Sequence, residues 1–292
     1  MKILVTGADG QLGSSLKKAF SSHPEIEVDY TDADTLDITS REDVAAYLSK
    51  KSYDLLINCA AYTAVDKAES DALTATKINT EAVGILAAEA KKRHTRVMHF
   101  STDYVFPGDH TCRPYNEHDE PDPHTIYGRT KLDGEAILKS FCPDAIIIRT
   151  AWLYCENGHN FVKTMLEKGR QNVPLRVVCD QIGTPTYAGD LATAVCEIIS
   201  SGKWCPGIYH FTNEGVASWY DFAKAIFRIA EVPAEVAPCM SHEYASAARR
   251  PLYSLLDKTK IKKTYSLKIP YWEDSLQRCI EKIMRTENIT TK

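Results

Sequence analysis

Apolar runs of strand length alternate with segments of helical periodicity through the first half of the chain. The expected strands are 3–5, 26–28, 55–59, 97–100 and 145–148. Between them, apolar residues recur at helical spacing, most clearly over 40–48 and 73–90. Strands that are apolar throughout and separated by helices predict a parallel sheet covered on both faces, which is a Rossmann-type doubly wound α/β fold.

The second half of the chain is less regular and predicts a smaller α/β domain. Helices are expected over 161–170, 190–199, 220–230 and 272–284, and strands over 175–179 and 208–211. Ser218 and Asp221 have the spacing of a capping box at the start of the third of these helices. We therefore expect a first domain over 1–150, which the chain re-enters around 175–200, and a second domain over 151–292. The segment 106–125 has no usable period, and long loops of this kind often cover an active site.

Composition narrows the class of protein without indicating an activity. The 292 residues include 35 Lys and Arg against 39 Asp and Glu, a net charge of −4, with no basic block of the kind that binds nucleic acid. No apolar run approaches the ~18 residues of a membrane span, and there is no signal-peptide pattern, so we expect a cytoplasmic protein. Nine cysteines without metal-site spacing are expected to be reduced thiols: Cys59, Cys112, Cys142, Cys155, Cys179, Cys196, Cys205, Cys239 and Cys279.

A glycine-rich turn follows the first expected strand. Gly7 permits a tight turn, Gly10 lets the backbone approach a ligand, and Gly13 allows the next helix to pack close to the strand. Gln11 and Leu12 lie in the first turn of that helix, whose N–H groups and partial positive charge suit a pyrophosphate. The position of this turn between the first strand and a helix favours dinucleotide binding over a purely structural turn.

Further cofactor contacts are expected at the ends of the second and third strands. Asp29, with Asp32 close behind, is a candidate for the adenosine ribose hydroxyls, although a solvated turn carboxylate explains either residue nearly as well. Asp37 and Ile38 would lie near the adenine, and Ala60, Ala61 and Tyr62 near the second ribose. The cofactor is therefore NADH or NADPH, and the sequence leaves the choice between them open. On this interpretation 1–150 is an NAD(P)-binding domain and 151–292 a substrate-binding domain.

Tyr127 and Lys131 are four residues apart in a segment of helical character, so their side chains share one face. A nearby ammonium favours loss of the tyrosine proton, and such a tyrosine can protonate a carbonyl oxygen during hydride transfer. Thr102 follows the fourth strand, at the edge where doubly wound folds bind ligands, and is the expected hydrogen-bond donor to the substrate carbonyl, with Ser101 as the alternative. Together these residues predict a reductase.

Several segments resemble a known family. The Gly-x-x-Gly-x-x-Gly spacing is similar to that of the short-chain dehydrogenase/reductase superfamily. Five further segments look like those of the dTDP-4-dehydrorhamnose reductases, an extended family within it: 60–69, 101–106, 149–154, 180–186 and 248–251. The resemblance extends from the N-terminus to about residue 256 and covers most of the chain.

The resemblance implies reduction of the 4-keto group of dTDP-4-dehydro-L-rhamnose by NAD(P)H, giving dTDP-L-rhamnose. It implies a catalytic triad of Thr102, Tyr127 and Lys131, in which Lys131 also binds the nicotinamide ribose. The sugar pocket that it implies is formed by Thr63, Val65, Asp103, Tyr104 and Trp152.

The diphosphate of the substrate needs positive charge or free N–H groups. Asn160 and Phe161 open a helix whose N-terminus could meet this diphosphate, and the resemblance supports the assignment. Arg249 and Arg250 are the obvious cations, with a solvated basic pair as the alternative. We expect a nucleotide-diphosphate sugar as the partner, neither nucleic acid nor membrane, and a monomer or a homodimer.

The chain departs from the family pattern at two places. The family commonly has Arg-Pro-x-Asn-Ser where this chain has Tyr253 in place of the asparagine, which puts any role of that asparagine in doubt. Some members form dimers around a metal held by glutamates, and the matching positions here are Ser15 and Asp190. We therefore predict no metal.

Proteins with the same fold and a similar site have other activities, or none. Related dehydratases have a glutamate after Thr-Asp, whereas Tyr104 follows Asp103 here, which favours simple reduction over elimination of water. A 4-epimerase would share Tyr127 and Lys131 but would not consume its cofactor. A non-catalytic NAD(P)-binding subunit, like the regulatory subunit of methionine adenosyltransferase, is the alternative outside enzymes. The presence of Thr102, Tyr127 and Lys131 together favours an enzyme.

Overall fold

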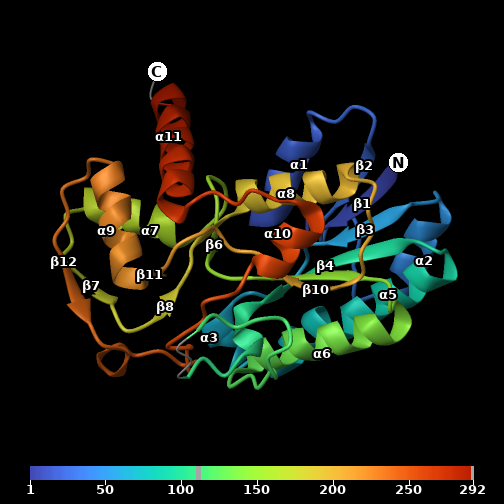
Figure 1. Ribbon diagram of the computed structural model, residues 1–292, viewed down its shortest axis with the longest axis horizontal. Helices are drawn as coiled ribbons and strands as arrows, with labels where there is room; N and C mark the ends of the chain where they lie inside the picture. Colours follow the sequence, from blue (N-terminus) through green and yellow to red (C-terminus); the bar gives the residue numbers. More distant parts are fainter. Residues whose placement is uncertain (110–112, 291–292) are drawn as a thin grey trace.

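A six-stranded parallel sheet forms the centre of the larger part of the molecule. The computed structural model describes residues 1–109 and 113–290. The strands are β1 (Lys2–Thr6), β2 (Glu27–Thr31), β3 (Leu55–Asn58), β4 (Arg96–Thr102), β5 (Ile146–Thr150) and β10 (Gly207–His210). Their order is β10-β5-β4-β3-β1-β2, with all neighbours parallel (Figure 1). The Rossmann-type fold predicted from the sequence is confirmed.

Helices cover both faces of the sheet because its strands are apolar on both sides. In β1, Ile3 and Val5 belong to the core beneath α1 (Gln11–Phe20), α8 (Ala188–Ser200) and α10 (Thr259–Tyr265). Leu4 points the other way, into the core beneath α2 (Arg41–Ser49), α5 (Ala82–Lys92) and α6 (Ile126–Phe141). Figure 1 shows these two layers above and below the sheet. The alternation of side chains along a strand thus builds two separate cores.

One long helical segment between β3 and β4 changes its winding in the middle. After α3 (Val65–Ala68), the chain forms α4 (Ala72–Thr76), a π-helical turn η1 (Lys77–Glu81) and then α5 without a break. The sequence predicts this segment as a single helix, which is correct in extent. The π-helical turn was not anticipated, and such turns frequently occur at functional sites.

The smaller part of the molecule packs around a third core. It contains α7 (Phe161–Arg170), α9 (Trp219–Ile229) and α11 (Trp272–Thr290). The short helix η3 (Ser241–Glu243) bonds Arg176, Asp180 and Gln181. Three short strand pairs complete this part: β6 (Leu153–Tyr154) with β9 (Thr186–Tyr187), β7 (Leu175–Val178) with β12 (Val236–Cys239), and β8 (Ile182–Gly183) with β11 (Ala217–Ser218). The capping box predicted for α9 is present, with Ser218 and Asp221 bonding reciprocally.

The chain passes between the two parts more than once. β7 pairs with β12 in the smaller part, whereas α8 packs against the face that α1 covers and β10 extends the large sheet. The sequence predicts β10 as a strand but assigns it to the second domain, because a short apolar run does not reveal which sheet it joins. A division near residue 150 remains a prediction. Both β10 and α10 depart from it, because each follows residue 150 but packs with the large sheet.

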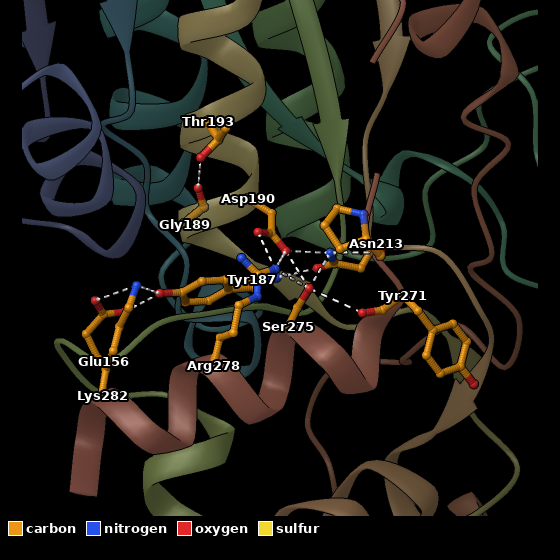
Figure 2. A network of polar contacts seen from close by, with 11 residues as sticks. Glu156, Tyr187, Gly189, Asp190, Thr193, Asn213, Tyr271, Ser275, Arg278 and Lys282 are labelled. Carbon is orange, nitrogen blue, oxygen red and sulfur yellow. Dashed lines mark hydrogen bonds and ion pairs between the residues drawn. The ribbon is translucent and has the colours of Figure 1, made fainter. Parts of the chain in front are cut away.

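A polar network fastens α11 to α8. Figure 2 shows Asp190 of α8 facing Asn213 together with Ser275 and Arg278 of α11. The carboxylate of Asp190 accepts hydrogen bonds at 2.7 Å from Asn213 Nδ2 and at 2.7 Å from Arg278. Ser15, the other position considered for a metal, donates its hydroxyl to the Gln11 carbonyl at 2.8 Å. Asp190 therefore holds two helices together through side chains of the protein itself.

The cysteines of the described residues form no disulfide. Eight cysteines are free thiols, and Cys112 lies outside the described residues. Within residues 1–109 and 113–290, no helix combines the length and the apolar character that crossing a bilayer requires.

A buried ion pair joins α6 to β5. Arg149 donates two hydrogen bonds to the Glu135 carboxylate, at 2.9 and 2.7 Å, and both side chains are at most 3% exposed. Removal of one partner from such a pair leaves an uncompensated charge in a region that excludes water.

We predict that Glu135→Gln lowers the free energy of unfolding by roughly 3 kcal/mol, because the Arg149 guanidinium loses its counter-charge. Denaturant unfolding of the purified protein measures this loss. Glu273→Gln is the matched control, since the Arg228–Glu273 pair is largely exposed and its removal costs at most about 1 kcal/mol. Equal losses in the two variants would contradict the prediction.

Candidate active site

The glycine turn connects β1 to α1 with almost no free space around it. Gly7 has φ +65°, and a Cβ added there would lie 2.5 Å from the Ala60 nitrogen. Gly13 packs equally closely, because its Cβ would lie 2.3 Å from the Gly7 carbonyl oxygen. Gly10 is the N-cap of α1 and provides no side-chain cap, so the first N–H groups of the helix remain available. Leu12 is buried in the core, which leaves only its backbone at this site.

A cavity of about 300 Å³ lies beside this turn, and we call it the glycine-turn cavity. Asp37, Ile38, Ala60 and Ala61 line it, as the sequence predicts. The Thr39 backbone and hydroxyl both donate to Asp37, and these bonds hold the pKa of its carboxyl below the usual value. A tight glycine turn, free helix N–H groups and an adjoining cavity suit the residues to a dinucleotide.

Asp29 does not line this cavity, contrary to the sequence-based expectation. Its carboxylate accepts hydrogen bonds from Lys51 Nζ at 2.8 Å and from the Tyr53 hydroxyl at 2.5 Å. The cause is the length of β2, which continues to Thr31 instead of ending at residue 28. The acidic residue after the strand is therefore Asp32, which lines the cavity and accepts a hydrogen bond from the Asp9 N–H at 2.9 Å.

The end of β4 and the start of α6 bring Thr102 and Tyr127 together. Thr125 caps α6 by accepting a hydrogen bond from the Gly128 N–H at 3.0 Å, so Tyr127 lies in the first turn. Burial raises the pKa of Tyr127 to about 12, opposed by a hydrogen bond with Thr102. The Tyr104 ring stands edge-on to that of Tyr127, with centroids 5.5 Å apart. The phenol therefore keeps its proton at neutral pH.

Thr102 is better placed than Ser101 for a role beside this phenol. The Thr102 hydroxyl donates to Asp103 Oδ1 at 3.0 Å and accepts from the Tyr104 N–H at 3.2 Å. Ser101 is buried, and its hydroxyl has no hydrogen-bond partner among the described residues. Burial also raises the pKa of Asp103 to about 6, since its side chain is almost fully enclosed.

Lys131 shares a helix face with Tyr127 but its head group is directed toward β4. Nζ donates to the Phe100 carbonyl at 2.7 Å and lies 3.4 Å from His99 Nε2. Burial lowers the pKa of Lys131 to about 8. The sequence-based expectation that this ammonium eases proton loss from Tyr127 is not met in this structure, because burial dominates the pKa of the phenol.

Asn79 of the π-helical turn is a residue that the sequence analysis missed. It is fully buried, and its amide bonds both the N–H of Tyr62, at 2.8 Å, and the Tyr62 carbonyl, at 3.1 Å. It also donates to the Thr130 hydroxyl at 3.2 Å. Asn79 thus connects the loop after β3 to α6. An asparagine inside a helical pattern carries no sequence signal for such a role.

A second cavity, of about 610 Å³, lies at the start of α7, and we call it the α7 cavity. Thr63, Val65, Asn160 and Phe161 line it, as expected from the resemblance. Asn160 caps α7 by accepting from the Lys163 N–H at 3.1 Å, and it donates to Gln11 Oε1 at 3.1 Å. One segment of the chain lines both cavities: Ala60 and Ala61 line the glycine-turn cavity, and Thr63 and Val65 line the α7 cavity.

The cations of the α7 cavity differ in part from those predicted. Arg250 lines the cavity and forms an ion pair with Asp66, whereas Arg249 is exposed and lies outside the lining. Lys168 and Arg176 also line it. The sequence analysis missed both, because single basic residues on a helix and a strand look like ordinary solvated charges.

Trp152, which the resemblance implies, and Tyr253, at which the chain departs from the family pattern, are both absent from the lining of the α7 cavity. Trp152 stacks on Trp219 of the cavity wall, with ring centroids 3.8 Å apart. Tyr253, which replaces an asparagine of the family pattern, donates its N–H to the Gly108 carbonyl at 2.9 Å. Its backbone thereby anchors the beginning of the 106–125 loop.

The fold and this site together define a Rossmann-type oxidoreductase of the short-chain dehydrogenase/reductase class. Within that class, the chain belongs to the RmlD substrate binding domain family, whose sequence profile matches residues 1–285.

Individual relatives cover nearly the whole chain. A dTDP-4-dehydrorhamnose reductase of Aggregatibacter actinomycetemcomitans is 40% identical over 94% of this chain and 97% of its own. A probable dTDP-4,6-dihydroxy-2-methyloxan-3-one 4-ketoreductase of Streptomyces antibioticus is 39% identical over 100% and 99%. The crystal structure of dTDP-4-dehydrorhamnose reductase from Bacillus anthracis in complex with NADP superposes with a TM-score of 0.92, at 36% identity over 96% and 99%.

Close packing at Gly128 gives a prediction about the site. A Cβ at Gly128 would lie 2.2 Å from the Tyr104 carbonyl oxygen, so the first turn of α6 would have to move away from β4. We predict that Gly128→Ala lowers turnover about 100-fold, the order expected for a displacement near 1 Å. Steady-state kinetics with the cofactor and a 4-keto sugar measures this.

Gly84→Ala in α5 is the control for the added methyl group. Its Cβ would meet the Ile137 side chain, with Cδ1 at 2.6 Å and Cγ1 at 3.2 Å, and this side chain can turn aside because no backbone atom is involved. Turnover by Gly84→Ala should stay close to that of the unmodified protein. A fully active Gly128→Ala variant would contradict the prediction.

Proposed function

We propose that this protein reduces the 4-keto group of dTDP-4-dehydro-L-rhamnose with NAD(P)H, forming dTDP-L-rhamnose. The observation that carries the proposal is the pairing of Thr102 with a protonated Tyr127. Two cavities in the same molecule support it, one beside the glycine turn and one with three cations. The names of relatives at about 40% identity over the full chain support the substrate. Consumption of the cofactor distinguishes this reaction from epimerisation.

The cofactor side of the proposal uses Gly7, Gly10, Gln11, Leu12 and Gly13 around the pyrophosphate. Asp32 takes the place of Asp29 at the adenosine ribose, with Asp37, Ile38, Ala60, Ala61 and Tyr62 along the remainder of the cofactor. The bound dihydronicotinamide supplies the hydride. A relative crystallised with NADP supports NADPH as one accepted form.

The chemical step requires one proton, which Tyr127 donates to the carbonyl oxygen as the hydride reaches the carbon. Thr102 donates a hydrogen bond to the same oxygen, and Asp103 and Tyr104 contact the sugar. Burial supports the role of Tyr127, because a phenol with a raised pKa keeps its proton until a developing alkoxide removes it. Lys131 holds the nicotinamide ribose.

The substrate side of the proposal uses the α7 cavity. Thr63, Val65 and Trp152 bound the sugar, while the N-terminus of α7 and the cations Lys168, Arg176 and Arg250 receive the diphosphate. Arg249 is left out because of its exposure.

A related 4-keto sugar is a second candidate substrate, since the Streptomyces relative carries the name of a different ketoreductase. A panel of dTDP-, UDP- and GDP-linked 4-keto sugars decides between them. We also propose a cytoplasmic monomer or homodimer, which light scattering distinguishes, and an NAD(P)-binding unit of residues 1–150 extended by α8 and β10.

We predict that Tyr127→Phe lowers turnover roughly 100- to 10,000-fold, because the proton donor is lost while the aromatic ring remains. NADPH oxidation with dTDP-4-dehydrorhamnose measures turnover, and fluorescence titration should give an almost unchanged dissociation constant for NADPH. Full turnover in this variant would refute the mechanism. Failure of the unmodified protein to oxidise NADPH with any sugar of the panel would refute the proposed function.

The adjacent arginines provide a matched pair for the diphosphate. We predict that Arg250→Ala raises KM roughly 10- to 100-fold, as expected for loss of about 1.5–3 kcal/mol in a charged hydrogen bond. Arg249→Ala should leave KM close to that of the unmodified protein, since Arg249 is exposed outside the cavity. Equal effects of the two substitutions would contradict this assignment.

A further inference from the structure

A chain of buried polar side chains runs beneath the site, across β1, β3 and β4 to α6. The Thr6 hydroxyl donates to Asn58 Oδ1 at 2.7 Å, Asn58 Nδ2 lies 3.1 Å from His99 Nδ1, and His99 Nε2 lies 3.4 Å from Lys131 Nζ. All four side chains are at most 2% exposed. Thr6, Asn58 and His99 occupy paired positions of neighbouring strands, so the sheet itself aligns them.

The donor directions along this chain are determined by one backbone group. The Ala60 N–H can only donate, and it bonds the amide atom of Asn58 assigned as Oδ1 at 3.1 Å, which identifies that atom as oxygen. The other amide atom of Asn58 is therefore nitrogen and donates to His99 Nδ1. Because His99 Nδ1 accepts, the proton of the neutral ring is on Nε2.

The Nε2–H of His99 faces Lys131 Nζ, and this restricts the protonation state of the lysine. An ammonium has three donors and no acceptor, so it would meet Nε2–H as a second donor in a buried place. A neutral amine has a lone pair that accepts from Nε2–H, while one of its own N–H groups donates to the Phe100 carbonyl at 2.7 Å. Only the amine satisfies both contacts.

We propose that His99 is a positioning residue that favours the neutral amine of Lys131 over its ammonium in the cofactor-free protein. The proposal rests on the proposed function only in assuming that Lys131 meets the cofactor; the tautomer of His99 does not depend on it.

The surroundings of Lys131 supply little negative charge to oppose this state. Besides His99, the titratable neighbours that face Lys131 among the described residues are Glu135 on α6 and Cys59 after β3. Glu135 is paired with Arg149, and burial raises the pKa of the Cys59 thiol, so that thiol is neutral. Burial lowers the pKa of Lys131 to about 8 and keeps the His99 ring neutral.

Above about pH 8, where the amine predominates in the free protein, binding of the cofactor takes up a proton, because Lys131 becomes an ammonium when its head group turns to the ribose hydroxyls. The lysine pKa is low in the free protein and higher in the complex. The affinity for the cofactor is therefore constant below about pH 8. Above that pH it falls about tenfold per pH unit, until the pH reaches the pKa that Lys131 has in the complex.

Two measurements on the unmodified protein test the proposal. Nitrogen-15 NMR of the histidine rings should show His99 as the Nε2–H tautomer, assigned by the signal that disappears in His99→Gln or His99→Phe. Calorimetric titration with NADPH in buffers of different ionisation enthalpy should show proton uptake above pH 8. An Nδ1–H tautomer, a charged His99 ring or no proton uptake would overturn the proposal.

His99→Gln separates positioning from simple packing. The glutamine can turn its carbonyl toward Lys131 and accept a hydrogen bond from an ammonium. The pH at which NADPH affinity begins to fall should therefore rise by about one unit. Above that pH, the variant should bind NADPH about tenfold more tightly, relative to its own affinity at neutral pH, than the unmodified protein does. His210→Gln is the control, since His210 is also buried and neutral but bonds the Tyr115 carbonyl. An unshifted profile in His99→Gln, or an equal shift in both variants, would overturn the proposal. These readouts use no sugar, so they stand apart from a failure of the proposed reaction.

Discussion

The packing of one face of α6 against the carboxyl ends of β4 and β5 is the constraint on which the site depends. The Glu135–Arg149 pair holds the third turn of that face on β5, and Gly128 lets the first turn approach the Tyr104 backbone. Since Tyr127 is adjacent to the first of these points and Lys131 lies between the two, their distances from β4 follow from the helix geometry. The chemistry is therefore positioned by contacts that take no part in it.

The same packing buries Tyr127, Asp103 and Lys131, and this burial shifts their pKa values. Burial raises the pKa of Tyr127 and of Asp103 and lowers that of Lys131. A raised pKa suits a group that donates a proton late in a reaction, because the group still holds its proton when the substrate binds. A lysine with a low pKa, in contrast, changes charge readily when a ligand reaches it.

Sequence patterns predicted the elements of this site better than its charged contacts. The spacing of Gly7, Gly10 and Gly13, between a strand and a helix, favours a dinucleotide-binding turn. The apolar strands leave few alternatives to a doubly wound sheet. Asp29 was misplaced because β2 continues to Thr31, so that Asp29 lies within the strand and its side chain contacts Lys51. No sequence pattern indicated that Arg176 and Lys168 line the α7 cavity. They do so because a strand and a helix border the same cavity, which only the fold reveals. Local pattern specifies periodicity and turns, whereas long-range pairing specifies which side chains meet.

The two cavities are connected by contacts that do not depend on a ligand. Gln11, at the start of the helix beside the glycine turn, accepts a hydrogen bond from Asn160, which caps the helix beside the α7 cavity. The loop after β3 lines both cavities, and Asn79 fixes that loop to α6. A shift of either helix N-terminus would therefore alter the other cavity and the position of Tyr127. Hydride transfer requires the cofactor, the substrate and a proton donor to be aligned. Because these hydrogen bonds already connect the two cavities, the alignment does not have to be established anew each time the ligands bind.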